Sequence, residues 1–230
     1  MIRDWIETLI GLPDHVWDAY AFAREPLAGK ITPEMRLEFA KKSRNCALDY
    51  AHRVNYNPET GDLEAVVRAQ GIKLDFDIGK DGGAYSMFAK FTVPDEISIC
   101  RESAIETDAL IEEENLFEML GDVKTENVLL AHEFFHYFEF ADPDAYTLKK
   151  HLLLWKLGPL KNESSIGALE EIGAMAFAQQ LLGLAYSPYV FDVLMLYPDN
   201  QQRAKAVYDA IMTIADRQAG FGEAQERKEG

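Results

Sequence analysis

Residues 132–136 read His-Glu-Phe-Phe-His and lie within a segment that is otherwise mostly apolar. Such a segment predicts a helix that is buried in the folded chain. Asp122 or Thr125 is expected to cap its start, and Pro143 disfavours helix at Asp142, so the helix should end there. Because buried histidines need polar partners, the rest of the chain must fold so that it supplies them.

The spacing of the two histidines indicates a metal site. Side chains four residues apart on a helix share one face, so His132 and His136 can direct both imidazoles at one point. Imidazole nitrogen is a common zinc ligand, and catalytic zinc usually has three protein ligands and a water molecule. Glu133 follows the first histidine and is placed to act as a general base toward that water. The sequence therefore predicts a Zn²⁺ cofactor and a hydrolytic site.

The third ligand is sought among carboxylates in apolar surroundings. Glu170 and Glu171 are the charged residues of the segment 164–182, which is apolar nearly all round and predicts a buried helix. A buried carboxylate is costly unless it is paired or bound to a metal ion. Small residues follow on the Glu171 face and permit close helix packing, which favours Glu171. An ion pair with Arg or Lys is the alternative explanation for either glutamate.

Asp142 is a rival for the third position. It occupies the last place of an extended HExxHxxGxxH pattern in which Asp can replace the final histidine. The glycine of that pattern is replaced here by Glu139, however, and without glycine the required bend is harder to form. A turn before Pro143 also explains Asp142. The sequence therefore favours Glu171 over Asp142.

Bulk composition narrows the range of partners. The net charge of −16 argues against binding to nucleic-acid phosphates or to anionic membranes. The first residues mix charges with apolar side chains, unlike a secretory signal, and no uninterrupted apolar run suggests a membrane span. We therefore expect a cytoplasmic protein whose partner is a protein or peptide substrate, with no nucleic acid and no membrane involved.

The pattern along the chain predicts an α+β fold. Helices are expected at 3–22 with a break near 11–13, at 33–55, at 63–70, at the motif, from a cap at Asn162, Ser164 or Ser165 to Leu182, and at 199–217. Residues 145–157 are expected to form a helix or an extended arm. Strands are expected at 72–78, 85–91 and 96–100, giving a small, largely antiparallel sheet on the motif helix. We divide the chain into an N-terminal helical segment (1–58), a core (59–195), and a C-terminal helix with a polar tail (196–230).

These elements resemble the ImmA/IrrE-like family of zinc metallopeptidases over about residues 60–190. The shared features are a short helix ending at Gly71, an Ile-Ser-Ile strand, the Ala-His-Glu-x-x-His helix and a Glu-x-x-Ala helix that begins with Glu171. The resemblance implies a minimal zincin-like fold of the gluzincin type. It implies zinc ligation by His132, His136 and Glu171. Two departures are Phe135, where the family often has glycine, and Gly173.

The expected activity is hydrolysis of peptide bonds, with Glu133 moving the proton. A further donor usually stabilises the oxyanion of such reactions, and the candidates are His151, Tyr137, Tyr186 and Tyr189. Two alternatives remain open. One is a metal-binding regulatory or interaction protein with little turnover, and the other is a zinc hydrolase that acts on substrates other than peptides.

Overall fold

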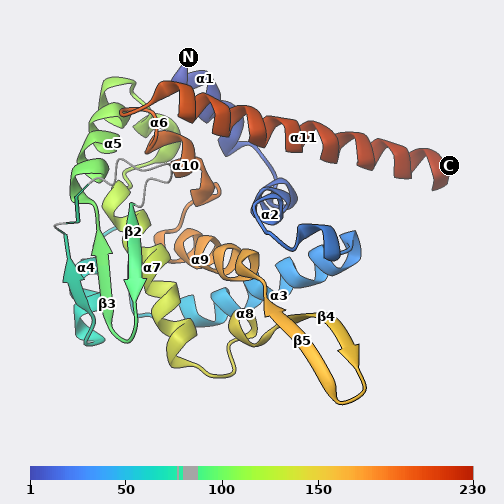
Figure 1. Cartoon of the computed structure of the whole chain (residues 1–230). Helices are drawn as coiled ribbons and strands as arrows, with labels where there is room; N and C mark the ends of the chain where they lie inside the picture. The colour runs from blue at the N-terminus through green and yellow to red at the C-terminus, as the bar shows by residue number, and fades with distance from the viewer. Residues whose placement is uncertain (77, 80–87, 230) are drawn as a thin grey trace.

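The computed structural model describes residues 1–76, 78–79 and 88–229. Within them the chain is an α+β structure in which helices predominate over two small sheets (Figure 1). The helices are α1 (Ile2–Ile10), α2 (Asp14–Ala23), α3 (Pro33–Ala51), α4 (Leu63–Ala69), α5 (Arg101–Glu113), α6 (Phe117–Leu120), α7 (Thr125–Ala141), α8 (Tyr146–Lys149), α9 (Gly167–Leu182), α10 (Phe191–Leu194) and α11 (Gln201–Glu229). Short 3₁₀ turns span Ala28–Lys30 and Pro188–Val190.

The first sheet contains the strands β1 (Lys73–Asp75), β2 (Ala89–Thr92) and β3 (Glu96–Ile99) in the order β1-β3-β2. Three strands were expected here, and each falls within its predicted range or overlaps it. The arrangement differs, since β3 pairs antiparallel with β2 but parallel with β1. The sheet is therefore mixed rather than largely antiparallel. Much of the predicted strand at 85–91 and residue 77 of the predicted first strand lie outside the described residues.

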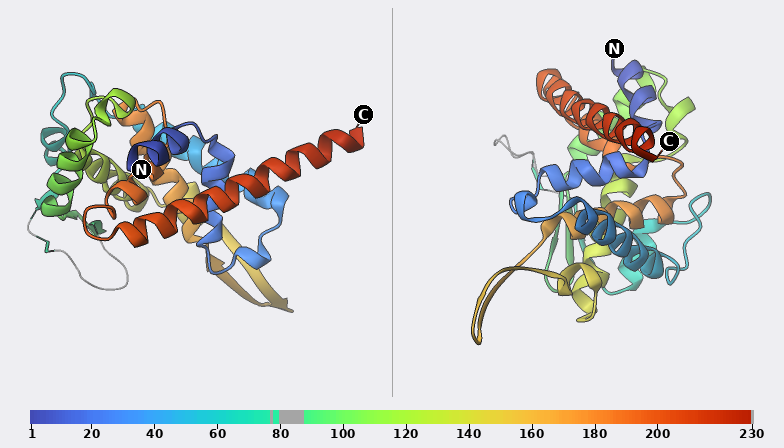
Figure 2. Two further views of the ribbon diagram at one scale, coloured as in Figure 1. Left: turned by 90° about the horizontal axis from the view of Figure 1, so that it is seen from above. Right: turned by 90° about the vertical axis from the view of Figure 1, so that its right-hand side faces the viewer.

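A β-hairpin occupies the segment between α8 and α9. Its strands are β4 (His151–Leu157) and β5 (Leu160–Ser165), and it projects from the body as an arm in all three views (Figures 1 and 2). The segment 145–157 thus contains both expected alternatives in succession, a short helix and an extended arm. The prediction that Asn162, Ser164 or Ser165 caps the next helix was wrong, because all three lie in β5.

The two helices expected to hold the metal site pack against each other. Helix α7 lies between α9 on one side and the strands β2 and β3 on the other, and α3 also packs on α9 (Figure 1). The side chains of Phe134 and Phe135 on α7 are fully buried. The core is continuous from α1 to α11, and the division at 58/59 and 195/196 stays a prediction.

Carboxylates from other elements accept hydrogen bonds from the first turns of α7 and α9. Asp108 on α5 accepts hydrogen bonds from the backbone N–H and the hydroxyl of Thr125, the first residue of α7. Glu25, just after α2, accepts one from the N–H of Ala168 in the first turn of α9. Neither Asp122 nor Thr125 caps α7, so that prediction was wrong, whereas its predicted end at Asp142 is confirmed.

The C-terminal part differs from expectation in length. Helix α11 was expected to end near residue 217, but its backbone remains helical to Glu229, and it extends well beyond the body (Figures 1 and 2). Among the described residues, no helix is both long enough and apolar enough to cross a membrane.

Candidate metal centre

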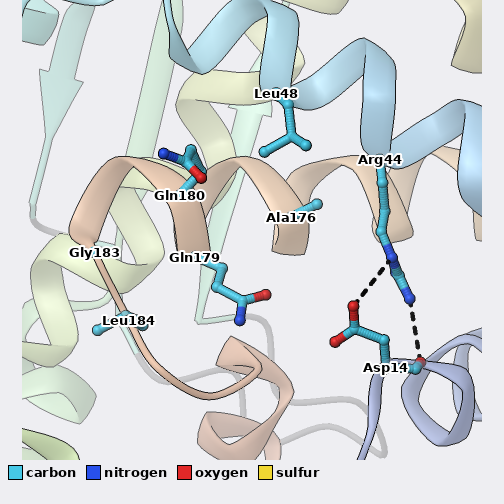
Figure 3. Close-up of a pocket in the computed structure, with 8 residues that line it drawn as sticks. All are labelled: Asp14, Arg44, Leu48, Ala176, Gln179, Gln180, Gly183 and Leu184. Atoms are coloured by element: carbon cyan, nitrogen blue, oxygen red, sulfur yellow. Dashed lines mark hydrogen bonds and ion pairs between the residues drawn. The ribbon is translucent and has the colours of Figure 1, made fainter.

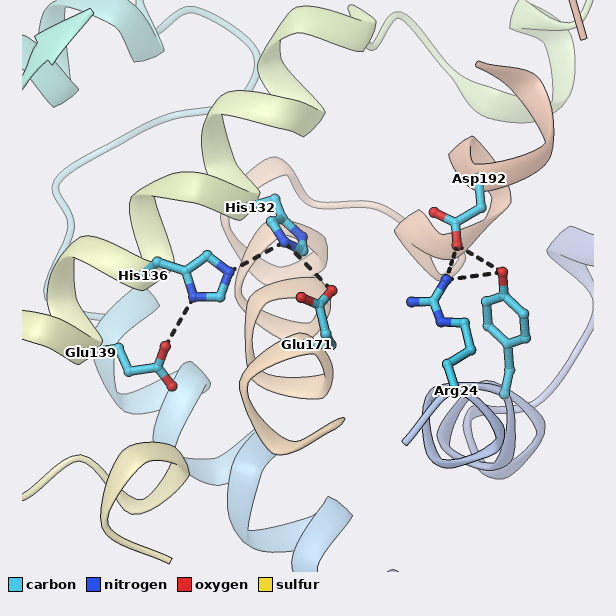
Figure 4. A network of polar contacts seen from close by, with 7 residues as sticks. Arg24, His132, His136, Glu139, Glu171 and Asp192 are labelled. Atoms are coloured by element: carbon cyan, nitrogen blue, oxygen red, sulfur yellow. Dashed lines mark hydrogen bonds and ion pairs between the residues drawn. The ribbon is translucent and has the colours of Figure 1, made fainter. Parts of the chain in front are cut away.

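His132, His136 and Glu171 converge on one point between α7 and α9 (Figure 4). The two Nε2 atoms are 3.4 Å apart, and a carboxylate oxygen of Glu171 lies 3.7 Å from Nε2 of His132. Two nitrogens bound tetrahedrally to one zinc ion at about 2.0–2.1 Å would be about 3.3 Å apart. The arrangement therefore fits a zinc ion without rearrangement of the helices.

Glu139 occupies the position behind the second histidine. One of its carboxylate oxygens lies 2.9 Å from Nδ1 of His136, and its side chain is only 2% exposed. A carboxylate that accepts the Nδ1–H proton fixes the tautomer in which Nε2 is the free ligand atom. The second oxygen of Glu139 is buried without a hydrogen-bond partner. Glu139 was considered above only for the glycine it replaces, so its contact with His136 was not predicted.

The electrostatics of the two rings differ. Burial, together with the neighbouring His136, lowers the pKa of His132. Burial also acts against a charged His136, but the hydrogen bond to Glu139 and the charge of Glu133 outweigh it and raise the pKa of His136. His132 therefore favours the neutral form. The carboxylates that stabilise a charged His136 would also offset the charge of a bound cation.

Glu133 lies beside the three candidate ligands and is buried. Burial raises the pKa of its carboxyl group to about 7, with a further contribution from Glu171, while His136 and a backbone hydrogen bond from Phe91 act in the opposite direction. Phe91 belongs to β2, a strand that packs on α7, so β2 runs beside the carboxylate of Glu133. A carboxyl group with these surroundings can accept and return a proton near neutral pH.

Glu170 is part of a second group. It lies close to His136 and Glu139, and a set of their ligand atoms falls within 4.8 Å of one another. Burial and the charge of Glu139 raise the pKa of Glu170 to about 7. No ion pair joins Glu170 to a lysine or arginine within the described part of the chain.

Asp142 belongs to neither group of candidate ligands. Its carboxylate accepts a hydrogen bond of 2.8 Å from the hydroxyl of Tyr50 and one of 2.9 Å from the N–H of Asp144. It therefore forms the turn that ends α7, which is the role Pro143 suggested. Asp142 as a metal ligand has no support in the structure.

The candidate oxyanion donors lie in different surroundings. Tyr186 is buried, and its hydroxyl donates to the carbonyl of Leu120. His151 is exposed at the base of the hairpin, and the hydroxyl of Tyr137 is 3.4 Å from the carbonyl oxygen of Gln70. Tyr189 is buried near Glu171. Burial, and after it the charge of Glu171, raises the pKa of its phenol.

Phe135 does not line an approach to the metal centre. Its ring is fully buried and packs where Gly173 of α9 leaves space, so closely that a Cβ on Gly173 would meet ring atoms at 2.6 and 2.9 Å. Phe135 therefore fills space between α7 and α9. The two departures from the family pattern are a matched pair, because the large residue on one helix requires the absent side chain on the other.

A separate pocket lies between α2, α3 and the C-terminal half of α9 (Figure 3). Arg44 reaches into it from α3 and pairs with Asp14 and Asp18 on α2. None of the candidate metal ligands lines this pocket. Its remaining lining is Leu48, Ala176, Gln179, Gln180, Gly183 and Leu184.

Comparisons of the chain with protein-family models, with curated proteins and with solved structures give no match. The resemblance to the ImmA/IrrE-like family accordingly rests on the motifs quoted above.

Proposed function

We propose that this chain is a zinc-dependent metallopeptidase with a minimal zincin-like core. The observation that supports this most is the convergence of His132, His136 and Glu171 at zinc-ligand separations, with buried Glu133 beside them. Two histidines that were merely exposed on a helix would need no carboxylate from a second helix and no carboxylate at the Nδ1 atom of a ring. Here Glu171 and Glu139 provide both.

Each residue has a distinct task in this proposal. His132, His136 and Glu171 hold the metal ion, and Glu139 orients His136 through its Nδ1 atom. Zinc in such a site supplies Lewis acidity toward a carbonyl oxygen and lowers the pKa of water to about 7. Glu133 takes up the proton released on attack and delivers it to the leaving amine, so that the amine departs neutral.

The surroundings suit an extended peptide as substrate. The side chain of Glu171 is 41% exposed, so the ligand side of the centre opens to solvent. Strand β2, which contacts Glu133 through Phe91, pairs only with β3 among the described strands. An extended chain that paired with this edge would pass beside Glu133. A peptide or protein substrate in the cytoplasm, with no nucleic acid and no membrane, agrees with the acidic composition.

Glu133→Gln tests the proposal. The amide is isosteric but cannot take up the proton, so turnover of a fluorogenic peptide library or of casein should fall by at least about 10²-fold. Zinc content should stay the same, because Glu133 is not a ligand. Glu102→Gln, at an exposed position on α5, makes the same chemical change and should keep full activity. Wild-type protein that binds zinc but cleaves nothing, or a Glu133→Gln variant as active as wild type, would contradict a peptidase and favour the metal-binding regulatory alternative.

A further inference from the structure

Arg24 faces the candidate metal centre from α2, a helix outside the region that resembles the family. It follows the last residue of α2, where a positive charge is favourable. The next residue, Glu25, is bonded to the N–H of Ala168 in α9. Since Glu171 lies one turn further along α9, the contact of Glu25 fixes the position of Arg24 relative to a metal ligand.

The guanidinium group is held in place by buried and half-buried partners. Its Nη1 atom donates to Asp192 at 2.8 Å and lies 3.1 Å from the hydroxyl of Tyr20. The group also stacks over the ring of Tyr20 at 4.5 Å and lies 5.6 Å from the ring centre of Tyr189. A side chain fixed on several sides has already lost much of its rotamer freedom, which suits a binding group.

Donors of Arg24 remain available on the side of the metal centre. Both hydrogen bonds of its side chain to protein groups use Nη1, so Nε and Nη2 have no protein acceptor in the described residues. Figure 4 shows one guanidinium nitrogen without contacts on the side that faces Glu171. The two side chains form no ion pair, and Arg24 is 45% exposed, so its free donors can reach a substrate.

Charge effects agree with this placement. After burial and His136, the positive charge of Arg24 is the next factor that lowers the pKa of His132. Glu171 in turn is among the negative charges that raise the pKa of Arg24 against the effect of burial. The surroundings of Glu133 are instead dominated by His136, Glu171 and Phe91. Arg24 and Glu133 also come from different elements, since Arg24 ends α2, which packs on α9, and Glu133 lies on α7, which packs on β2.

We propose that Arg24 is the group that stabilises the oxyanion formed at the scissile carbonyl, and that Asp192 and Tyr20 are its positioning residues. This inference rests on the proposed function, because it assumes that a carbonyl is attacked at this centre. Arg24 fits the role better than Tyr186 and Tyr189. The Tyr186 hydroxyl is used by Leu120, and the Tyr189 hydroxyl is buried below the surface that a substrate can touch.

The test measures binding of a transition-state analogue as well as turnover. The probe is a phosphinic tripeptide, blocked at both ends, whose phosphinate supplies the anionic oxygens of the tetrahedral state. Arg24→Gln in the zinc-loaded protein should weaken its binding by about 10²-fold and lower kcat about as much, with a smaller change in KM. Zinc content should be unchanged. Arg53→Gln, at an exposed position after α3, is the matched control and should bind the probe normally.

Arg24→Lys separates binding from folding. Lysine can keep the ion pair with Asp192 but lacks the planar fork that leaves donors for a second acceptor. It should therefore melt like wild type and still lose at least about tenfold in probe affinity. If Arg24→Gln and Arg24→Lys both bind the probe as wild type does, the oxyanion role is wrong.

Two further outcomes are decisive. If Arg24→Gln loses affinity only for probes that end in a free carboxylate, Arg24 binds the C-terminal carboxylate of the substrate. The oxyanion proposal is then overturned. If the wild-type protein binds neither zinc nor the probe, the peptidase proposal itself fails, and the role of Arg24 fails with it.

Discussion

Replacement of Gly173 by alanine tests the close packing between α7 and α9, the two helices that carry the candidate metal ligands. The new Cβ would lie 2.6 and 2.9 Å from ring atoms of Phe135 and 3.3 Å from Cγ2 of Thr147. Ordinary carbon contacts are about 3.5–4.0 Å, so the ring or α9 must move by about 1 Å. Such overpacking costs about 1–3 kcal/mol, and the better helix propensity of alanine returns about 1 kcal/mol.

We therefore expect Gly173→Ala to lower the free energy of unfolding by up to about 2 kcal/mol. For a chain of this size the melting temperature should fall by up to about 8 °C. Thermal unfolding monitored by circular dichroism in EDTA measures this without a contribution from metal. Separation of α7 from α9 also moves Glu171 away from the histidines, so zinc affinity measured by chelator competition should fall as well.

A control and a second substitution isolate the cause. Gly167→Ala changes the same helix, but its Cβ would meet only a Glu25 oxygen at 3.8 Å, so stability should be unchanged or slightly higher. Phe135→Leu replaces the ring with a smaller side chain. In that background Gly173→Ala should lower the free energy of unfolding less, with a coupling energy of at least about 0.5 kcal/mol. If Gly173→Ala stabilises the protein, or if the two effects simply add, the packing argument is refuted.

Two other substitutions probe the supports of the site. Glu139→Gln removes the charge behind His136 and should weaken zinc affinity by about 10–100-fold in a chelator competition; an unchanged affinity would contradict its role. Asp108→Ala removes the acceptor for the first residue of α7 and should cost about 1–2 kcal/mol in denaturant unfolding. Asp108→Asn keeps an acceptor oxygen and should cost less, and equal losses for both variants would argue against a capping role.

Local sequence patterns were sufficient for most of the elements. The break between α1 and α2, the end of α4 before Gly71 and the end of α9 at Gly183 follow from residues at those positions. The left-handed backbone at Gly71 and Gly183 is the conformation that glycine adopts without strain. Spacing along a helix likewise placed His132 and His136 on one face.

Contacts between distant elements were beyond the same reasoning. The starts of α7 and α9 were predicted from nearby side chains, but Asp108 and Glu25 supply the acceptors from other helices. The parallel pairing of β1 with β3 likewise depends on how the chain crosses the sheet. Periodicity within a segment contains no information about such partners.

In the candidate site, too, local patterns could be predicted and contacts between distant segments could not. A buried, charge-poor helix was enough to select Glu171, which the structure brings to His132. Arg24 gave no signal, because it lies in the N-terminal segment far from the motif in sequence. Glu139 was noted for the glycine it replaces, and only the helix geometry reveals that its carboxylate faces His136.

The most direct test of the central proposal is the zinc affinity of purified wild-type protein, Glu171→Ala and Asp142→Ala. Chelator competition and atomic absorption would give affinity and stoichiometry for each. Wild type should bind one zinc ion per chain, Asp142→Ala should bind it equally well, and Glu171→Ala should lose most of the affinity. Loss of zinc in Asp142→Ala with retention in Glu171→Ala would contradict the proposed ligand set.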